Sequence, residues 1–227
     1  DGASSAEQLE RCPLRPMLPI LVAAALAALA ASLALILSGG ASPAAAAHIA
    51  FAAGILPLIS GAMLHFVPVL MRGRPPGRML QLLPLAMLAA GLLAAAAFLL
   101  PPFFEAGIRL AVLAGLTSAV ILAGWIRRRS RVALGAPHPG LHWYLAAVLC
   151  LALALAAVLA MEFFPAQRAA LRLFHLHLNT LGFIGLTALG TLAVLLPTAV
   201  GRPDPDAAGW LRRMLPWTLA GVLLTAV

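Results

Sequence analysis

Long apolar runs separated by short polar loops dominate the sequence. Six of these runs approach or exceed the roughly 20 residues that a helix needs to cross a bilayer, and a shorter run ends the sequence. No segment alternates apolar and polar residues with period two, so the runs predict helices rather than barrel strands. The pattern therefore predicts an all-α fold, a polytopic transmembrane helical bundle that forms a single domain. Its seven spans are expected at about residues 16–38, 45–71, 79–100, 106–126, 141–164, 168–198 and 209–227.

The seventh run is the shortest of the predicted spans. Its apolar part begins at Met214 and ends with the sequence at Val227, which leaves only 14 residues (214 to 227). A complete crossing needs more than that. We expect the seventh helix to be incomplete and the protein to continue beyond it.

Composition agrees with a membrane protein, and the charges predict its orientation. The chain is 63% hydrophobic, and all 15 of its basic residues are arginines, which give a formal net charge of +8. Arginine gathers in alternate loops and in the N-terminal segment, and such an excess is typical of the cytoplasmic side. These arginines are Arg11, Arg15, Arg72, Arg74, Arg78, Arg127, Arg128, Arg129, Arg131, Arg202, Arg212 and Arg213.

The opposite loops hold few charges, namely Glu105, Arg109, Glu162, Arg168 and Arg172. We therefore predict a bacterial inner-membrane protein with a cytoplasmic N-terminus, in contact with anionic lipids rather than nucleic acid. Other membrane subunits or further copies of the chain are expected partners. Cys12 and Cys150 form no CxxC motif and predict no disulfide framework. The N-terminus lacks the pattern of a removable signal peptide.

The sixth predicted span places two histidines inside an apolar helix. His175 and His177 lie two residues apart, so they point to roughly opposite sides of that helix. Polar residues at membrane depth are costly and suggest function. The alternative is that both histidines form hydrogen bonds to neighbouring helices. The small or polar residues that follow are Asn179, Thr180, Gly182, Gly185 and Gly190. The three glycines would let a neighbouring helix or a flat cofactor come close.

The other histidines sort by depth under the predicted orientation. His48 lies near the outer start of span two, at a level similar to the pair in span six. His65 follows 17 residues later (65 − 48), about 25 Å deeper in a helix. His138 and His142 open span five on the cytoplasmic side. The sequence therefore has an outer histidine set and a looser inner one.

Histidine side chains in a membrane span are typical ligands of haem iron or of another metal. Two histidines from different helices can hold one porphyrin, and the lack of a CxxCH motif indicates b-type haem. Copper remains an alternative, since Met63, Met71 and Met161 add soft donors, although a methionine in an apolar span is more often ordinary packing. Structural zinc would need cysteines or four convergent ligands, which the sequence lacks.

Two stretches resemble helices of subunit I of the haem–copper oxidases. HLHLN in span six is similar to that family's HxH helix, and His48 with LPLISGAMLHFVPVLMRGRP resembles its second helix. The resemblance implies that His48 and His177 ligate a low-spin haem and that His175 faces a second, high-spin haem. It covers about two of seven spans. NnrS-like membrane haem proteins linked to nitric oxide metabolism are an alternative relative.

The sequence also departs from the oxidase pattern. It has no adjacent histidine pair to bind copper, and HPGLHWY at His138 lies on the predicted cytoplasmic side. We interpret that motif as a helix start, with Trp143 and Tyr144 in the interfacial belt. No carboxylate or lysine lies in the middle of a span, so no proton-pumping relay is visible.

These features lead to one functional hypothesis and several alternatives. We expect electron transfer through one or two b-type haems. A second haem or a haem–copper centre would bind or reduce oxygen or nitric oxide, and the protein would then be an oxidoreductase. The alternatives are copper transport or insertion, a purely structural subunit, and a two-haem conduit whose inner haem uses His65 with His138 or His142. His65 could equally be an interior hydrogen-bonding residue. Arg168 and Arg172 would either bind haem propionates or extend to the membrane interface.

Overall fold

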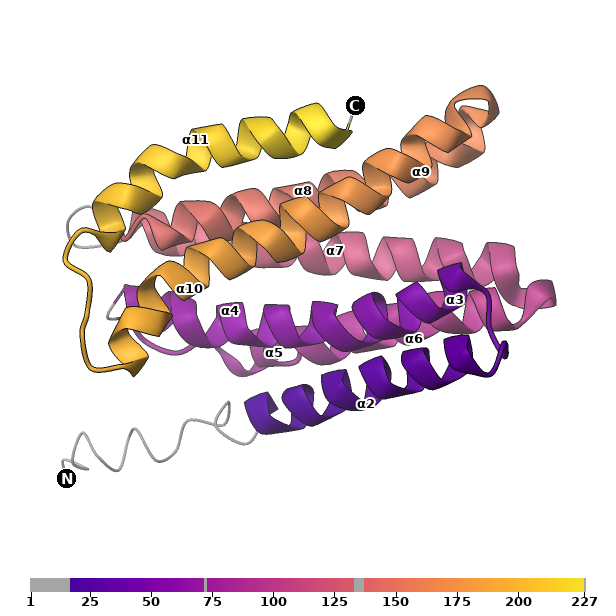
Figure 1. Ribbon diagram of the computed structural model, residues 1–227, viewed down its shortest axis with the longest axis horizontal. Coiled ribbons are helices and arrows are strands. Elements are labelled where there is room, and N and C mark those ends of the chain that lie inside the picture. Colours follow the sequence, from indigo (N-terminus) through magenta and orange to yellow (C-terminus); the bar gives the residue numbers. More distant parts are fainter. Residues whose placement is uncertain (1–16, 72, 133–136, 227) are drawn as a thin grey trace. The chain divides into compact units, whose positions relative to one another are not determined.

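The computed structural model describes residues 17–71, 73–132 and 137–226, and all regular elements in these ranges are helices (Figure 1). The chain divides into two compact units, residues 1–111 and 112–227, and the single domain stays a prediction. Each unit is described by itself. Five residues named above lie outside the described ranges: Arg11, Cys12, Arg15, Arg72 and Val227.

Six helical segments are long and apolar enough to cross a membrane, and they coincide with the first six predicted spans. No end differs from its predicted position by more than five residues. The protein is therefore an all-α, multi-pass membrane protein, as predicted. The segments are Met17–Leu37, Pro43–Leu70, Arg78–Leu99, Pro101–Arg131, Gly140–Phe163 and Pro165–Ala199.

The fourth predicted span differs most in length from the helix that forms, and the seventh is the predicted span that lies outside these six segments. Helix α7 (Phe104–Arg131) continues past its apolar part through a group of arginines, whose positive charge is favourable at a helix C-terminus. Helix α11 (Ala207–Ala226) forms at the seventh predicted position. It carries Arg212 and Arg213 and is not among the six segments above. Its crossing of the membrane stays a prediction.

In unit one, span two is the central helix. It contacts both α2 and the following helix α6, mainly through its π-helical part η1. The closest approach is at Gly91 of α6, whose missing side chain lets the helix lie against the backbone of Ala52. The elements of this unit are α2 (Met17–Leu37), α3 (Pro43–Ala47), η1 (His48–Ile55), α4 (Leu56–Leu70), α5 (Arg78–Gln81), α6 (Leu83–Leu99), the 3-10 turn η2 (Pro101–Phe103) and the start of α7.

In unit two, span six packs along α8 over most of its length. A Cβ atom on Gly182 would lie 2.7 Å from Cβ of Cys150, and one on Gly190 would lie 2.6 Å from Cβ of Trp143. These glycines therefore admit a neighbouring helix, one of the two roles predicted for them. The elements are the rest of α7, α8 (Gly140–Phe163), the 3-10 turn η3 (Pro165–Gln167), α9 (Arg168–His177), the π-helix η4 (Leu178–Gly185), α10 (Leu186–Ala199) and α11.

Candidate functional site

The two histidines expected to bind one haem each adjoin a π-helical segment. Segment η1 begins at His48, and η4 begins at the residue after His177. π-Helices are rare, and those inside α-helices are frequent at functional sites. Because the two histidines belong to different units, each site is described separately.

Local chemistry accounts for both π-helical segments. Pro57 follows η1 and has no N–H to donate to the carbonyl four residues back, so the α-helical ladder is interrupted there. In η4, the side-chain amide of Asn179 donates to the carbonyl of His175 at 2.8 Å, and the hydroxyl of Thr180 donates to the carbonyl of Leu176 at 2.8 Å. These side chains compete with the backbone N–H groups for the same acceptors.

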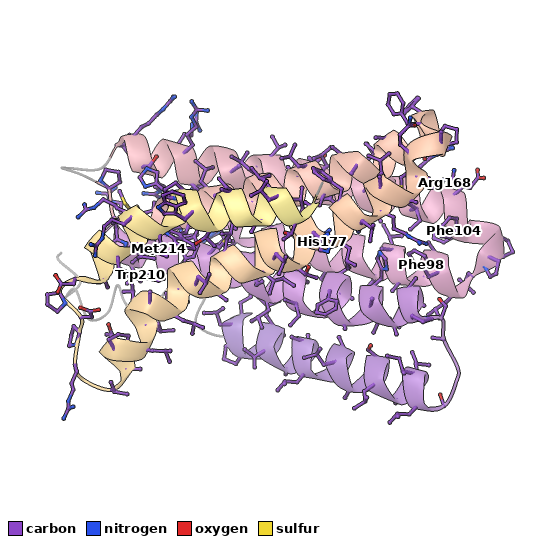
Figure 2. The ribbon with its side chains drawn as sticks, turned by 45° about the horizontal axis from the view of Figure 1, so that its top comes forward. Phe98, Phe104, Arg168, His177, Trp210 and Met214 are labelled. Carbon is purple, nitrogen blue, oxygen red and sulfur yellow. The ribbon has the colours of Figure 1, made fainter. Side chains whose placement is uncertain are left out.

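The ring of His48 is oriented by a backbone carbonyl and an aromatic neighbour. Its Nδ1 lies 2.7 Å from the carbonyl oxygen of Ala44. A carbonyl only accepts, so Nδ1 carries the proton and Nε2 carries the lone pair. The ring also lies on Phe98 of α6, with centroids 4.4 Å apart, and Phe98 meets Phe104 edge-on at 5.3 Å (Figure 2). A ring N–H held by a carbonyl is the usual arrangement of a metal-binding histidine.

His177, labelled in Figure 2 at the end of α9, is half-buried and has a polar atom with no partner. Its Nδ1 is fully buried and makes no hydrogen bond within the described part of the chain. Most buried polar atoms in proteins are paired, and an unpaired one costs about 1–3 kcal/mol. A bound group that makes a bond to this nitrogen would remove that cost.

His175 faces the neighbouring helix α8. Its Nδ1 lies 2.9 Å from the carbonyl oxygen of Ala154, to which it donates. The amide nitrogen of Asn179 lies 3.3 Å from the same ring nitrogen. His175 therefore connects two helices of unit two. This contact matches the alternative in which histidines of span six form hydrogen bonds to a neighbouring helix.

The inner histidines have other surroundings. His65, in unit one, meets Phe66 edge-on with ring centroids 5.3 Å apart. In unit two, Nδ1 of His138 accepts a hydrogen bond from the backbone N–H of Gly140 at 3.1 Å, which is a helix-start role as the sequence indicated. Burial lowers the pKa of His138, and the positive charge of Arg212 lowers it further. His142 is exposed.

Trp143 and Tyr144 are buried within unit two, and their position in the interfacial belt stays a prediction. The indole N–H of Trp143 donates to the carbonyl of Leu211 at 3.0 Å, and its ring stacks on Trp210 of α11. The hydroxyl of Tyr144 lies 2.9 Å from that of Thr191 on α10. Partners from α10 and α11 satisfy both polar groups, which makes their burial favourable.

Arg168 and Arg172 are exposed at the start of α9. The described residues show no ion pair for either side chain. Both predicted roles, binding of haem propionates and extension to the membrane interface, therefore remain predictions.

The metal-binding potential of the described residues is limited to separate side chains. No group of three or more histidine, cysteine, aspartate or glutamate side chains is placed to hold a metal ion in the described ranges. Haem needs only one axial side chain on each face, because the porphyrin supplies the other four ligands. The ring geometry of His48 fits that requirement.

Comparison with known proteins adds no relative: the sequence matches no family model, and neither a curated protein nor a solved structure matches it. The likeness to haem–copper oxidases therefore rests on the motifs in spans two and six.

Sequence reasoning missed two parts of the site. One is Phe98, for which a single phenylalanine in an apolar span gives no signal. The other is the pair of π-helical segments. For η4 a signal was present, since Asn179 and Thr180 directly follow the histidine pair and can both donate to backbone carbonyls.

Proposed function

We propose that this protein is a membrane-bound b-type haem protein that transfers electrons and uses His48 and His177 as axial ligands. The observation that carries the proposal is that each of these two histidines adjoins a π-helical segment. The resemblance in spans two and six assigns both to one low-spin haem. The arginine distribution supports a bacterial inner membrane with a cytoplasmic N-terminus.

The residues would divide the work as follows. His48 would present Nε2 to the iron, while the carbonyl of Ala44 holds the Nδ1 proton and fixes the ring. His177 would supply the second imidazole. Arg168 and Arg172 would pair with the propionates, because guanidinium groups match carboxylates geometrically. The haem itself supplies reversible one-electron chemistry, tuned by these ligands.

Reduction of oxygen or nitric oxide would be the enzymatic extension of this proposal. It needs a second centre, which the resemblance places at His175. The hydrogen bond from Nδ1 of His175 to α8 is of the same kind as that of His48, so it does not decide that step. Electron transfer, which needs only His48 and His177, is the function we put forward.

The test is a spectrum of the detergent-purified protein, reduced with dithionite, together with a pyridine haemochrome assay. We expect a b-type α-band and one haem per chain. His48→Ala and His177→Ala should each abolish or strongly shift that band. His142→Ala is the matched control, since His142 is exposed, and its spectrum should equal that of the wild type.

Three outcomes would contradict the proposal. A protein that stays colourless after haem is supplied during expression would exclude haem binding and direct attention to copper analysis. Two haems per chain, each lost in a different mutant, would favour a two-haem conduit. An unchanged band in both alanine variants would remove His48 and His177 as ligands.

A further inference from the structure

Spans two and six share a sequence register that the motif comparison did not use. Three residue pairs differ in number by 129: His48 and His177, Gly61 and Gly190, and Pro68 and Pro197. Each span is followed by the tripeptide Gly-Arg-Pro, at residues 73–75 and 201–203. Arg-Met-Leu follows in the next helical segment of each unit, at residues 78–80 in α5 and 213–215 in α11.

The π-helical segments lie one residue off this register, since their first residues differ in number by 130 (178 − 48). Segment η1 runs from 48 to 55, and η4 runs from 178 to 185, so each occupies eight residues at the histidine. Each is followed by an α-helix with a proline near its end, Pro68 in α4 and Pro197 in α10. The two spans therefore have the same sequence of helix types.

Glycine contacts with the preceding helix correspond as well. A Cβ atom on Gly61 would overlap Leu21 of α2, and one on Gly190 would lie 2.6 Å from Trp143 of α8. The contacted residues differ in number by 122 (143 − 21). About two turns earlier, a Cβ atom on Gly54 would lie 3.0 Å from Ala28, and one on Gly182 would lie 2.7 Å from Cys150. These contacted residues are again 122 apart (150 − 28). Gly54 and Gly182 differ by 128, one residue off register within the π-helical segments.

An inter-helix hydrogen bond completes the correspondence. In unit one, the hydroxyl of Ser32 on α2 donates to the carbonyl of Ala46 at 2.8 Å. In unit two, the ring of His175 donates to the carbonyl of Ala154 on α8 at 2.9 Å. The positions again differ by 122 (154 − 32) and by 129 (175 − 46). The same two positions are therefore bonded in both units. The donor lies on the preceding helix in unit one (Ser32 on α2) and on span six itself in unit two (His175).

We infer that the chain contains one helical module twice, and that His48 and His177 are the same position of the two copies. The offsets 122 and 129 account for the histidines, both prolines, the contacts of Gly61 and Gly190, and the hydrogen bond, while Gly54 and Gly182 depart from them by one residue. His175 then corresponds to Ala46 rather than to a ligand. It is a positioning residue that ties span six to α8, as Ser32 ties span two to α2. Only the identity of the group bound by His48 and His177 rests on the proposed function.

The correspondence can be tested by moving the hydrogen bond from one helix to the other. His175→Ala should lower the melting temperature of the haem-free protein in detergent by about 2–4 °C, the shift typical for loss of one such bond in a chain of this size. Adding Ala154→Ser would place a hydroxyl where unit one has Ser32. We expect the double variant to recover most of that loss, while Ala154→Ser alone, which keeps His175, should change little.

Each readout has a distinct meaning. A double variant that melts no higher than His175→Ala, or that fails to fold while Ala154→Ser folds, would overturn the equivalence of the two units. A double variant of wild-type stability that loses a haem band or carbon monoxide binding would overturn the positioning role and make His175 a ligand. A wild-type protein without haem would refute the proposed function alone, because the melting temperatures of the haem-free variants would still decide the inference.

Discussion

Gly91→Ala should loosen the contact that supports the π-helical segment beginning at His48. Gly91 lies on α6, where its Cα hydrogen faces the backbone of η1. An added Cβ atom would overlap the carbonyl of Ala52 and lie 2.6 Å from the backbone nitrogen of Ala53. Both neighbours are backbone atoms, so no side chain can rotate away. The two helices would have to separate by roughly 1 Å to restore an ordinary contact.

The expected cost combines two opposing terms. Overpacking of this kind destabilises a fold by about 1–3 kcal/mol. Replacing glycine by alanine inside a helix contributes about 0.5–1 kcal/mol in the opposite direction. The net loss is therefore about 0–2.5 kcal/mol relative to the wild type. Relative to a glycine-to-alanine change without overpacking it is about 1–3 kcal/mol, which for a chain of this length lowers the melting temperature by roughly 2–12 °C.

The assay is thermal unfolding in detergent followed by tryptophan fluorescence, with Gly124→Ala as the control. Gly124 lies on α7 and is exposed, and a Cβ atom added there has no neighbour within 4 Å. That variant should melt at or slightly above the wild-type temperature. Should Gly91→Ala melt as high as Gly124→Ala, the close approach of α6 to η1 would be wrong. If haem is bound at His48, Gly91→Ala should also shift its spectrum, because Phe98 on α6 contacts the His48 ring.

Two further predictions concern the packing of unit two. The pKa of His138 is lowered on folding, so the stability that this residue contributes is complete above its unfolded pKa of about 6.5 and is lost as the pH falls toward the folded pKa. The melting temperature should therefore drop less between pH 7.5 and 5.5 in His138→Ala than in the wild type. Equal drops in the two proteins would exclude the effect. Tyr144→Phe removes the hydrogen bond to Thr191 and should cost about 0.5–1.5 kcal/mol, and a double-mutant cycle with Thr191→Val that yields no coupling would contradict that bond.

The sequence by itself determined the class of the fold and the position of six spans. A helix needs about 20 apolar residues to cross a bilayer. Only helices and closed barrels satisfy the hydrogen bonds of the backbone in lipid. Those two requirements are local, so they can be read directly from a stretch such as residues 141–164. The same reasoning located the histidines within the spans, because depth in a helix follows from residue number.

Only the tertiary structure decided which way those side chains face. Most of these helices are apolar all round, so periodicity does not distinguish a packed face from a lipid-facing one. This is why the burial of Trp143 and Tyr144 against neighbouring helices was not predicted. It also explains why the different surroundings of His175 and His177 could not be foreseen: a hydrogen bond to Ala154 and an unpaired Nδ1 depend on what the neighbouring helix presents at that height.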